Sequence, residues 1–114
     1  MKVYVGERQT DGSCRVYIEQ PDTTRVRLRH RSSGGHSPTG FEWGYGGSGP
    51  AELARALVKD VTGVEEPEAR VYQRFKFRVV GGLPQDGWRL TEAEIRAALE
   101  AIAAEDHARN SEDV

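Results

Sequence analysis

A row of alternating arginines is the strongest charge feature of the sequence. The segment T-R-V-R-L-R-H-R carries an arginine at every second position, namely Arg25, Arg27, Arg29 and Arg31. Alternate side chains of a β-strand point to the same face, so a strand here would present these guanidinium groups roughly 7 Å apart. Guanidinium groups form paired hydrogen bonds with phosphates and carboxylates, and the row therefore predicts a surface for an anionic ligand or an acidic protein partner. The alternative is that the arginines only keep an exposed strand face polar and are neutralised by the acidic C-terminal half of the chain.

A glycine-rich segment follows, and it could also contact an anion. Residues 44–49 read G-Y-G-G-S-G, which satisfies the G-x-G-x-x-G pattern of dinucleotide-binding turns. Pro50 comes next and favours a helix start, where free N–H groups and the helix dipole attract phosphate. Pro50 also stands where a Walker loop needs lysine, and no second strand with an acidic end follows about twenty residues later. Two interpretations stay open, an anion-binding loop and glycines needed for close packing. The candidate contacts are Gly46, Gly47, Ser48 and Gly49.

Three aromatic residues alternate just before the last glycines. Phe41, Trp43 and Tyr45 predict a short strand with its aromatic side chains on one face and Glu42 on the other. Trp43 and Tyr45 are candidates for stacking on a flat ligand, and packing in the core is the alternative. Glu42, placed between aromatics, could have a raised pKa and act as a general base, or be an ordinary exposed carboxylate.

Other chemistry receives less support from the residue types. His30, His36 and His107 are far apart and have no ligand-spaced cysteine or carboxylate beside them, so we expect neither a metal site nor a cofactor. Cys14 alternates with apolar residues and is predicted to be a small buried side chain. An enzyme acting on a nucleotide or another phosphate compound, through Glu42 or His36, remains the catalytic alternative to a binding module.

The composition is that of one ordinary globular domain. The chain has 114 residues, 37% of them apolar, and a net charge of −2, with a mean hydropathy of −0.65 that indicates a thin core. We expect one domain over residues 1–108 and a disordered acidic tail over 109–114. A single cysteine and the absence of an apolar leader or span predict a cytoplasmic protein without a membrane partner. The overall acidity and the lack of a known nucleic-acid-binding motif disfavour a nucleic-acid partner.

Alternating apolar residues predict the strands. We expect strands over residues 2–8, 13–19, 24–31 and 41–45, with a hairpin turn at Gly12 between the first two. The first 45 residues therefore predict an antiparallel sheet of three or four strands. With two or three helices packed on one face, the fold class is α+β.

Helical spacing and end signals predict the helices. One begins at Pro50 and stops at Gly63, and a second covers residues 67–80, where a strand over 75–79 is the alternative. A turn over 85–87 precedes Trp88. A third helix begins near Glu92 behind a capping box of Thr91 and Glu94, and should fray near His107.

The chain also resembles a family of uncharacterised proteins. The resemblance rests on S-P-T-G-F-E-W-G-Y-G-G-S-G-P-A-E-L-A-R-A-L, followed by Y-Q-R-F-K, V-V, L-P, G-W-R-L-T and E-I, and covers about residues 1–96. Similar small domains of unknown function are found in bacterial genomes, phages and other mobile elements. The resemblance implies no activity, cofactor or site residue. It implies a setting in which small proteins often act by binding, including anti-CRISPR-like inhibitors of host defence.

These observations together favour a non-catalytic binding module. Its surface would combine the arginine row with the glycine loop, provided that the two lie on the same side of the domain. The ligand would be an anionic, phosphate-bearing molecule or an acidic protein surface. A protein-interaction inhibitor anchored by Trp88 or another exposed aromatic is the alternative.

Overall fold

A computed structural model describes residues 1–29 and 40–112, with side chains described as far as residue 108. The elements follow one another as three strands, two helices, a short 3-10 turn, a fourth strand and a last helix. Their bounds are β1 (Val3–Arg8), β2 (Cys14–Glu19), β3 (Arg25–Arg27), α1 (Ser48–Thr62), α2 (Ala69–Arg78), η1 (Val80–Gly82), β4 (Gly87–Thr91) and α3 (Glu92–Glu112). The α+β prediction is confirmed.

The strands form one antiparallel sheet in the order β3-β2-β1-β4. β1 and β2 make the predicted hairpin, in which Gly12 has a positive φ of 87° and the Asp11 carboxylate accepts a bond from the Ser13 N–H. β3 is shorter than predicted and pairs with the outer edge of β2 only from Arg25 to Arg27.

The predicted strand over residues 41–45 is wrong. This segment is a loop, because Gly44 takes a positive φ of 84° and turns the chain between the alternating aromatics. The fourth strand is instead β4, which lies within a segment read from the sequence as a turn and the approach to a helix, and it pairs with the free edge of β1. The tight placement of β4 shows in the pairing of Gly6 with Trp88, whose indole ring covers the glycine.

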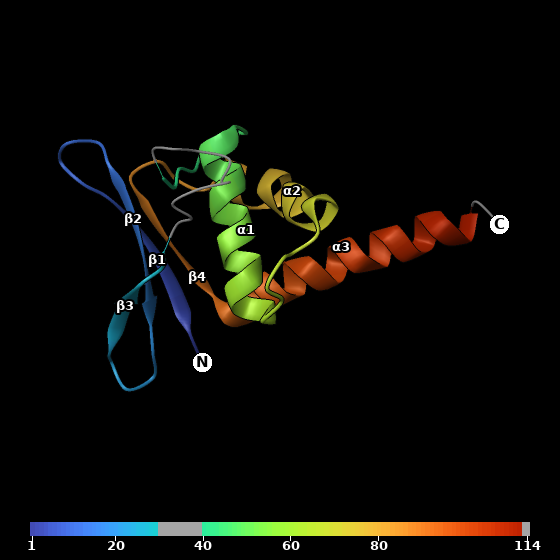
Figure 1. The fold of residues 1–114 in the computed structure, drawn as a ribbon, viewed down its shortest axis with the longest axis horizontal. Coiled ribbons are helices and arrows are strands. Elements are labelled where there is room, and N and C mark those ends of the chain that lie inside the picture. Colours follow the sequence, from blue (N-terminus) through green and yellow to red (C-terminus); the bar gives the residue numbers. More distant parts are fainter. Residues whose placement is uncertain (30–39, 113–114) are drawn as a thin grey trace.

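All three helices lie on one side of the sheet and leave its other face open (Figure 1). α1 lies nearest the sheet and buries an apolar stripe of Leu53, Leu57 and Val61. α2 is confirmed as a helix, so the alternative strand over 75–79 is not formed. Within the described residues, no helix combines the length and apolar character that crossing a membrane requires.

The last helix begins where the sequence predicts. Thr91 Oγ1 accepts a bond from the Glu94 N–H (3.1 Å), and the Glu94 carboxylate accepts one from the Thr91 N–H (3.0 Å), which completes the capping box. α3 then continues to Glu112, beyond the predicted fraying point at His107, and its C-terminal part projects from the body of the domain (Figure 1). Of the expected tail, residues 113 and 114 lie outside the described residues.

Replacing Gly6 by alanine should destabilise the fold. A Cβ atom on Gly6 would overlap the Trp88 indole ring, so the ring or β4 must shift, and such overpacking costs about 1–3 kcal/mol. Urea denaturation of G6A should show this loss in the free energy of unfolding. The matched control is G82A, where a Cβ atom meets nothing within 4 Å and the expected change is below about 0.5 kcal/mol. Equal stability of the two variants would contradict the packing argument.

Candidate functional site

The glycine loop is a packing element. A Cβ atom on Gly49 would lie 2.6 Å from the Cβ atom of Glu42, and one on Gly44 would lie 2.6 Å from Nε2 of Gln85. The Gly44 N–H also donates to the Val80 carbonyl (3.1 Å). Gly46 lies close to the Phe77 ring, so its open side is partly covered by an aromatic side chain. These contacts favour the close-packing interpretation of the glycines over the anion-binding one.

The aromatics of this segment do not share a face. Trp43 is completely buried, its Nε1 donates to the Gln85 carbonyl (3.0 Å), and its ring meets that of Trp88 edge-on at 5.5 Å. Tyr45 is 49% exposed and folds back over Gly47. Phe41 is buried as well, so the alternation of aromatics reflects two core residues and one surface residue, and Trp43 has no free face on which a ligand could stack.

Glu42 is an ion-pair partner and not a base with a raised pKa. Its carboxylate accepts bonds from Arg8 Nη2 (2.9 Å) and Arg8 Nη1 (3.2 Å), and from the Trp43 N–H (3.2 Å). The Arg8 guanidinium, which also lies 5.3 Å from the centre of the Trp43 ring, lowers the pKa of Glu42 below its usual value. The prediction of a raised pKa for Glu42 is therefore wrong, and a carboxylate with a lowered pKa is a weaker base.

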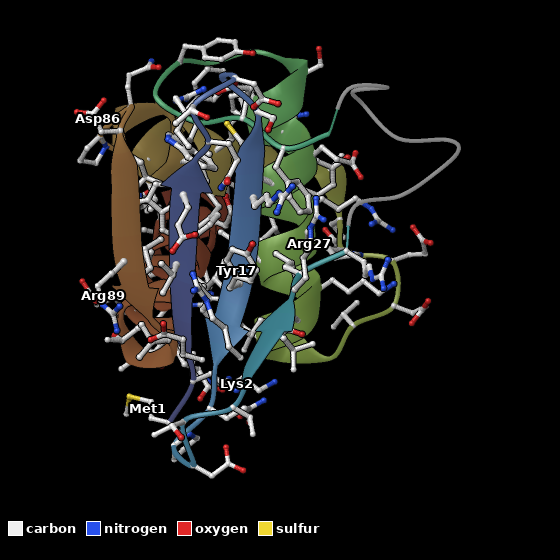
Figure 2. All side chains as sticks on the ribbon, turned by 90° about the vertical axis from the view of Figure 1, so that its left-hand side faces the viewer. Met1, Lys2, Tyr17, Arg27, Asp86 and Arg89 are labelled. Atoms are coloured by element: carbon white, nitrogen blue, oxygen red, sulfur yellow. The ribbon has the colours of Figure 1, made fainter. Side chains whose placement is uncertain are left out.

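The arginine row divides into two parts. Arg25 is neutralised within the fold, because it pairs with Glu7 and Glu19 and lies over the Tyr17 ring at 3.9 Å. Arg27 and Arg29 are exposed and have no ion pair in the described part of the chain. Arg31 lies outside the described residues. Figure 2 shows Tyr17 on the open face of the sheet and Arg27 at the β3 edge, beside α1.

Arg15 joins Arg27 and Arg29 at a small hollow, which we call the arginine hollow. It has a volume of about 260 Å³ and is lined by Cys14, Arg15, Val16, Arg27, Leu28, Arg29, Gly40 and Phe41. The pairing of β2 with β3 produces this meeting, since Tyr17 lies opposite Arg27 and the Leu28 N–H donates to the Val16 carbonyl (2.8 Å). No acidic residue is among the described residues that line it.

These three arginines differ from the other arginines whose side chains are described. Each of the others has a carboxylate partner in the fold, and they are Arg8, Arg25, Arg55, Arg70, Arg74, Arg78, Arg89 and Arg96. Arg15, Arg27 and Arg29 form no such pair with any described residue. The arginines without a carboxylate partner among the described residues therefore lie together at one place.

The site differs from the predicted combination of arginine row and glycine loop. No residue from Gly44 to Gly49 is among the described residues that line the arginine hollow, which the chain approaches only through Gly40 and Phe41. Arg15 was missed by sequence reasoning. The alternation of β2 indicates that Arg15 lies on the face opposite to Cys14 and Val16. That Arg15 lies beside Arg29 depends on the register of β2 on β3, which the sequence does not show.

The ion pair between Arg8 and Glu42 should make stability depend on pH. The pKa of Glu42 is lowered in the folded protein, so its stabilising effect is present above the unfolded pKa of about 4.3 and is lost as the pH falls through the folded value. We expect E42Q to lose about 1 kcal/mol of unfolding free energy at pH 7 and a smaller amount at pH 3. Urea titrations at both pH values measure this. E100Q, at an exposed position without an ion pair in the described part of the chain, is the control, and an equal loss in E42Q at both pH values would contradict the assignment.

Comparison with known proteins places the chain in a family. A family model described as "Family of unknown function (DUF6166)" matches residues 4–101. No curated protein and no solved structure matches the chain. The expected resemblance to an uncharacterised domain family is confirmed, whereas an origin in phages or mobile elements stays a prediction. Because the match runs from β1 into α3 and so covers the sheet and the helix layer, the chain belongs to the family of unknown function DUF6166.

Proposed function

We propose that the protein is a non-catalytic binding module that holds a phosphate group of an anionic ligand in the arginine hollow. The observation that carries the proposal is the pairing of charges. Every other arginine with a described side chain is matched by a carboxylate, and the three that are not line this hollow together.

The charge of the hollow supports an anion. Arg27 and Arg29 are two residues apart in an extended chain, so their charges repel each other by roughly 0.6 kcal/mol in water at about 7 Å. The attraction of a dianionic phosphate to each guanidinium outweighs this repulsion, and planar guanidinium groups suit the oxygens of phosphate. The net charge of the chain is −2, so the positive potential here is a local feature and not a property of the whole surface.

The size of the hollow fits a group and not a whole ligand. At about 260 Å³ it is smaller than the roughly 300–1,000 Å³ of sites that enclose complete small molecules. A single phosphate, or the carboxylate of an acidic side chain on a protein partner, is of suitable size. The arginine hollow would therefore hold only the anionic group, and the rest of the ligand would lie outside it.

The chemistry around the hollow supports binding and not catalysis. Cys14 is the one nucleophilic side chain among the described lining residues, and burial, assisted by the nearby Glu42 charge, raises the pKa of its thiol to about 11. A thiol with this pKa is protonated at neutral pH and is a poor nucleophile. Glu42 is engaged by Arg8, so neither group is prepared for proton transfer or attack.

Reversing the charge of the hollow should abolish anion binding without unfolding the protein. We expect R27E/R29E to weaken the binding of pyrophosphate by roughly 100-fold or more, since charge-assisted hydrogen bonds contribute about 1.5–3 kcal/mol each. The melting temperature should stay nearly unchanged, because neither arginine has an ion pair with a described residue. Isothermal titration calorimetry at low and physiological salt measures the affinity.

The matched control changes the same number of charges elsewhere. Arg70 and Arg89 have side chains that are each 62% exposed and line no hollow described for this chain, so R70E/R89E should retain at least half of the wild-type affinity. Equal losses in the two double variants would reduce the effect to net charge. Unchanged binding in R27E/R29E would remove the arginine hollow from the proposal.

A protein-interaction role is the second candidate, with a different anchor from the one predicted. Trp88 is buried and cannot serve as an anchor, whereas Phe77 is 70% exposed and lies against Gly46, with the Lys76 ammonium 4.1 Å from the centre of its ring. Large exposed aromatic side chains are enriched at protein–protein interfaces. A partner whose capture is lost in F77A and kept in R27E/R29E would favour this candidate over the phosphate-binding module.

A further inference from the structure

A second and larger hollow adjoins the arginine hollow. It has a volume of about 630 Å³ and shares Arg27, Leu28 and Arg29 with the first. We call it the helix hollow, because its opposite wall is α1 and the turn that follows. Its lining residues are Ile18, Val26, Arg27, Leu28, Arg29, Glu52, Arg55, Ala56, Lys59, Asp60, Gly63 and Glu65. The two hollows therefore meet at one short segment of the chain, Arg27 to Arg29, which forms part of the wall of each.

The lining of the helix hollow differs in kind from that of the arginine hollow. Ile18, Val26 and Ala56 give it an apolar surface from both the sheet and the helix. Apart from Arg27 and Arg29, which it shares with the arginine hollow, its cations are paired: Arg55 with Glu66 (3.1 Å) and Lys59 with Glu65 (3.2 Å). A second phosphate would meet carboxylates here, whereas an uncharged ring system would gain apolar contact.

Asp60 supplies an acceptor beside this apolar surface. The Tyr4 hydroxyl (2.5 Å) and the Lys2 ammonium (3.4 Å) both donate to its Oδ2 atom. These bonds hold the carboxylate in place and leave acceptor capacity on Oδ1, which receives no bond from the described residues. A nucleobase has this combination of properties, because it is flat, uncharged and carries N–H donors at its edge.

We propose that the ligand of this module is a nucleotide, with its phosphate in the arginine hollow and its nucleoside part in the helix hollow. This inference rests on the proposed function and adds the chemical class of the ligand. The volume of the helix hollow lies within the roughly 300–1,000 Å³ of small-molecule sites. One hollow selects by charge and the other by apolar contact and hydrogen-bond acceptance, so recognition of the two parts is separable.

Calorimetry with three probes tests the assignment. The probes are inorganic phosphate, ribose 5-phosphate and AMP, which add first the sugar and then the base to the same anion. We expect AMP to bind at least 10-fold more tightly than ribose 5-phosphate, because base burial and one hydrogen bond together are worth at least about 1.4 kcal/mol. All three probes should lose binding in R27E/R29E.

Variants in the helix hollow locate the base. A56L fills the hollow from α1 and should bring the affinity for AMP down to that for ribose 5-phosphate, while binding of inorganic phosphate is unchanged. A97L adds the same side chain at an exposed position of α3 and should keep the full advantage of AMP. If A56L does not fold, V26N replaces it, because Val26 is 54% exposed and lines the helix hollow but not the arginine hollow. V26N should lower the affinity for AMP several-fold.

The outcomes separate the two proposals. Equal affinities for AMP and ribose 5-phosphate, with binding still lost in R27E/R29E, would overturn the nucleotide and leave the phosphate-binding module standing. An advantage of AMP that survives both A56L and V26N would overturn the placement of the base. Absence of binding by all three probes in the wild-type protein would overturn both proposals.

Discussion

The close approach of Trp88 to Gly6 is the contact on which the arrangement of this domain depends. It can form only where β1 has no side chain, and it fixes β4 at the free edge of β1. The Trp88 ring then meets Trp43 edge-on, and Trp43 anchors the loop that leads into α1. The absence of a side chain at Gly6 thus allows the series of contacts that links β4, the glycine loop and α1.

The contact between Trp88 and Gly6 leaves a buried N–H group without an acceptor in the described part of the chain, and the surrounding packing must offset the free energy that this costs. The Trp88 Nε1 atom is buried and finds no hydrogen-bond acceptor among the described residues. An unpaired buried donor costs about 1–3 kcal/mol, which the burial of so large a ring repays through apolar contact. The glycines from Gly44 to Gly49 have a related purpose, because they let Glu42 and Gln85 approach the backbone closely. These contacts favour packing as the reason for the glycine spacing, which resembles that of a dinucleotide-binding turn.

The parts that could be predicted from the sequence are the local ones. The hairpin at Gly12, the capping box at Thr91 and all three helices follow from residues that are neighbours along the chain. The alternation over residues 41–45 is misleading, because apolar periodicity reports burial and does not distinguish a strand from a loop packed into the core. β4 could not be predicted in the same way, since its partner β1 is about eighty residues distant and its own sequence runs directly into a helix cap.

In the candidate site, too, the residue types could be predicted from the sequence, but their partners from distant segments could not. Three of the predicted arginines are described, and only the pairing of distant segments shows that Arg25 is neutralised by Glu7 while Arg27 and Arg29 are joined by Arg15. Partners of this kind depend on register, which residue types alone do not determine.

The distribution of ion pairs has a consequence for how this domain can change. Arg15, Arg27 and Arg29 project from a sheet edge that is already stabilised by Val16, Leu28 and the strand ladder, and no described carboxylate depends on them. Substitutions at these positions should therefore hardly affect folding. The same scaffold can carry a different charge at this edge, so a change in what the proposed site binds would not require a change of fold.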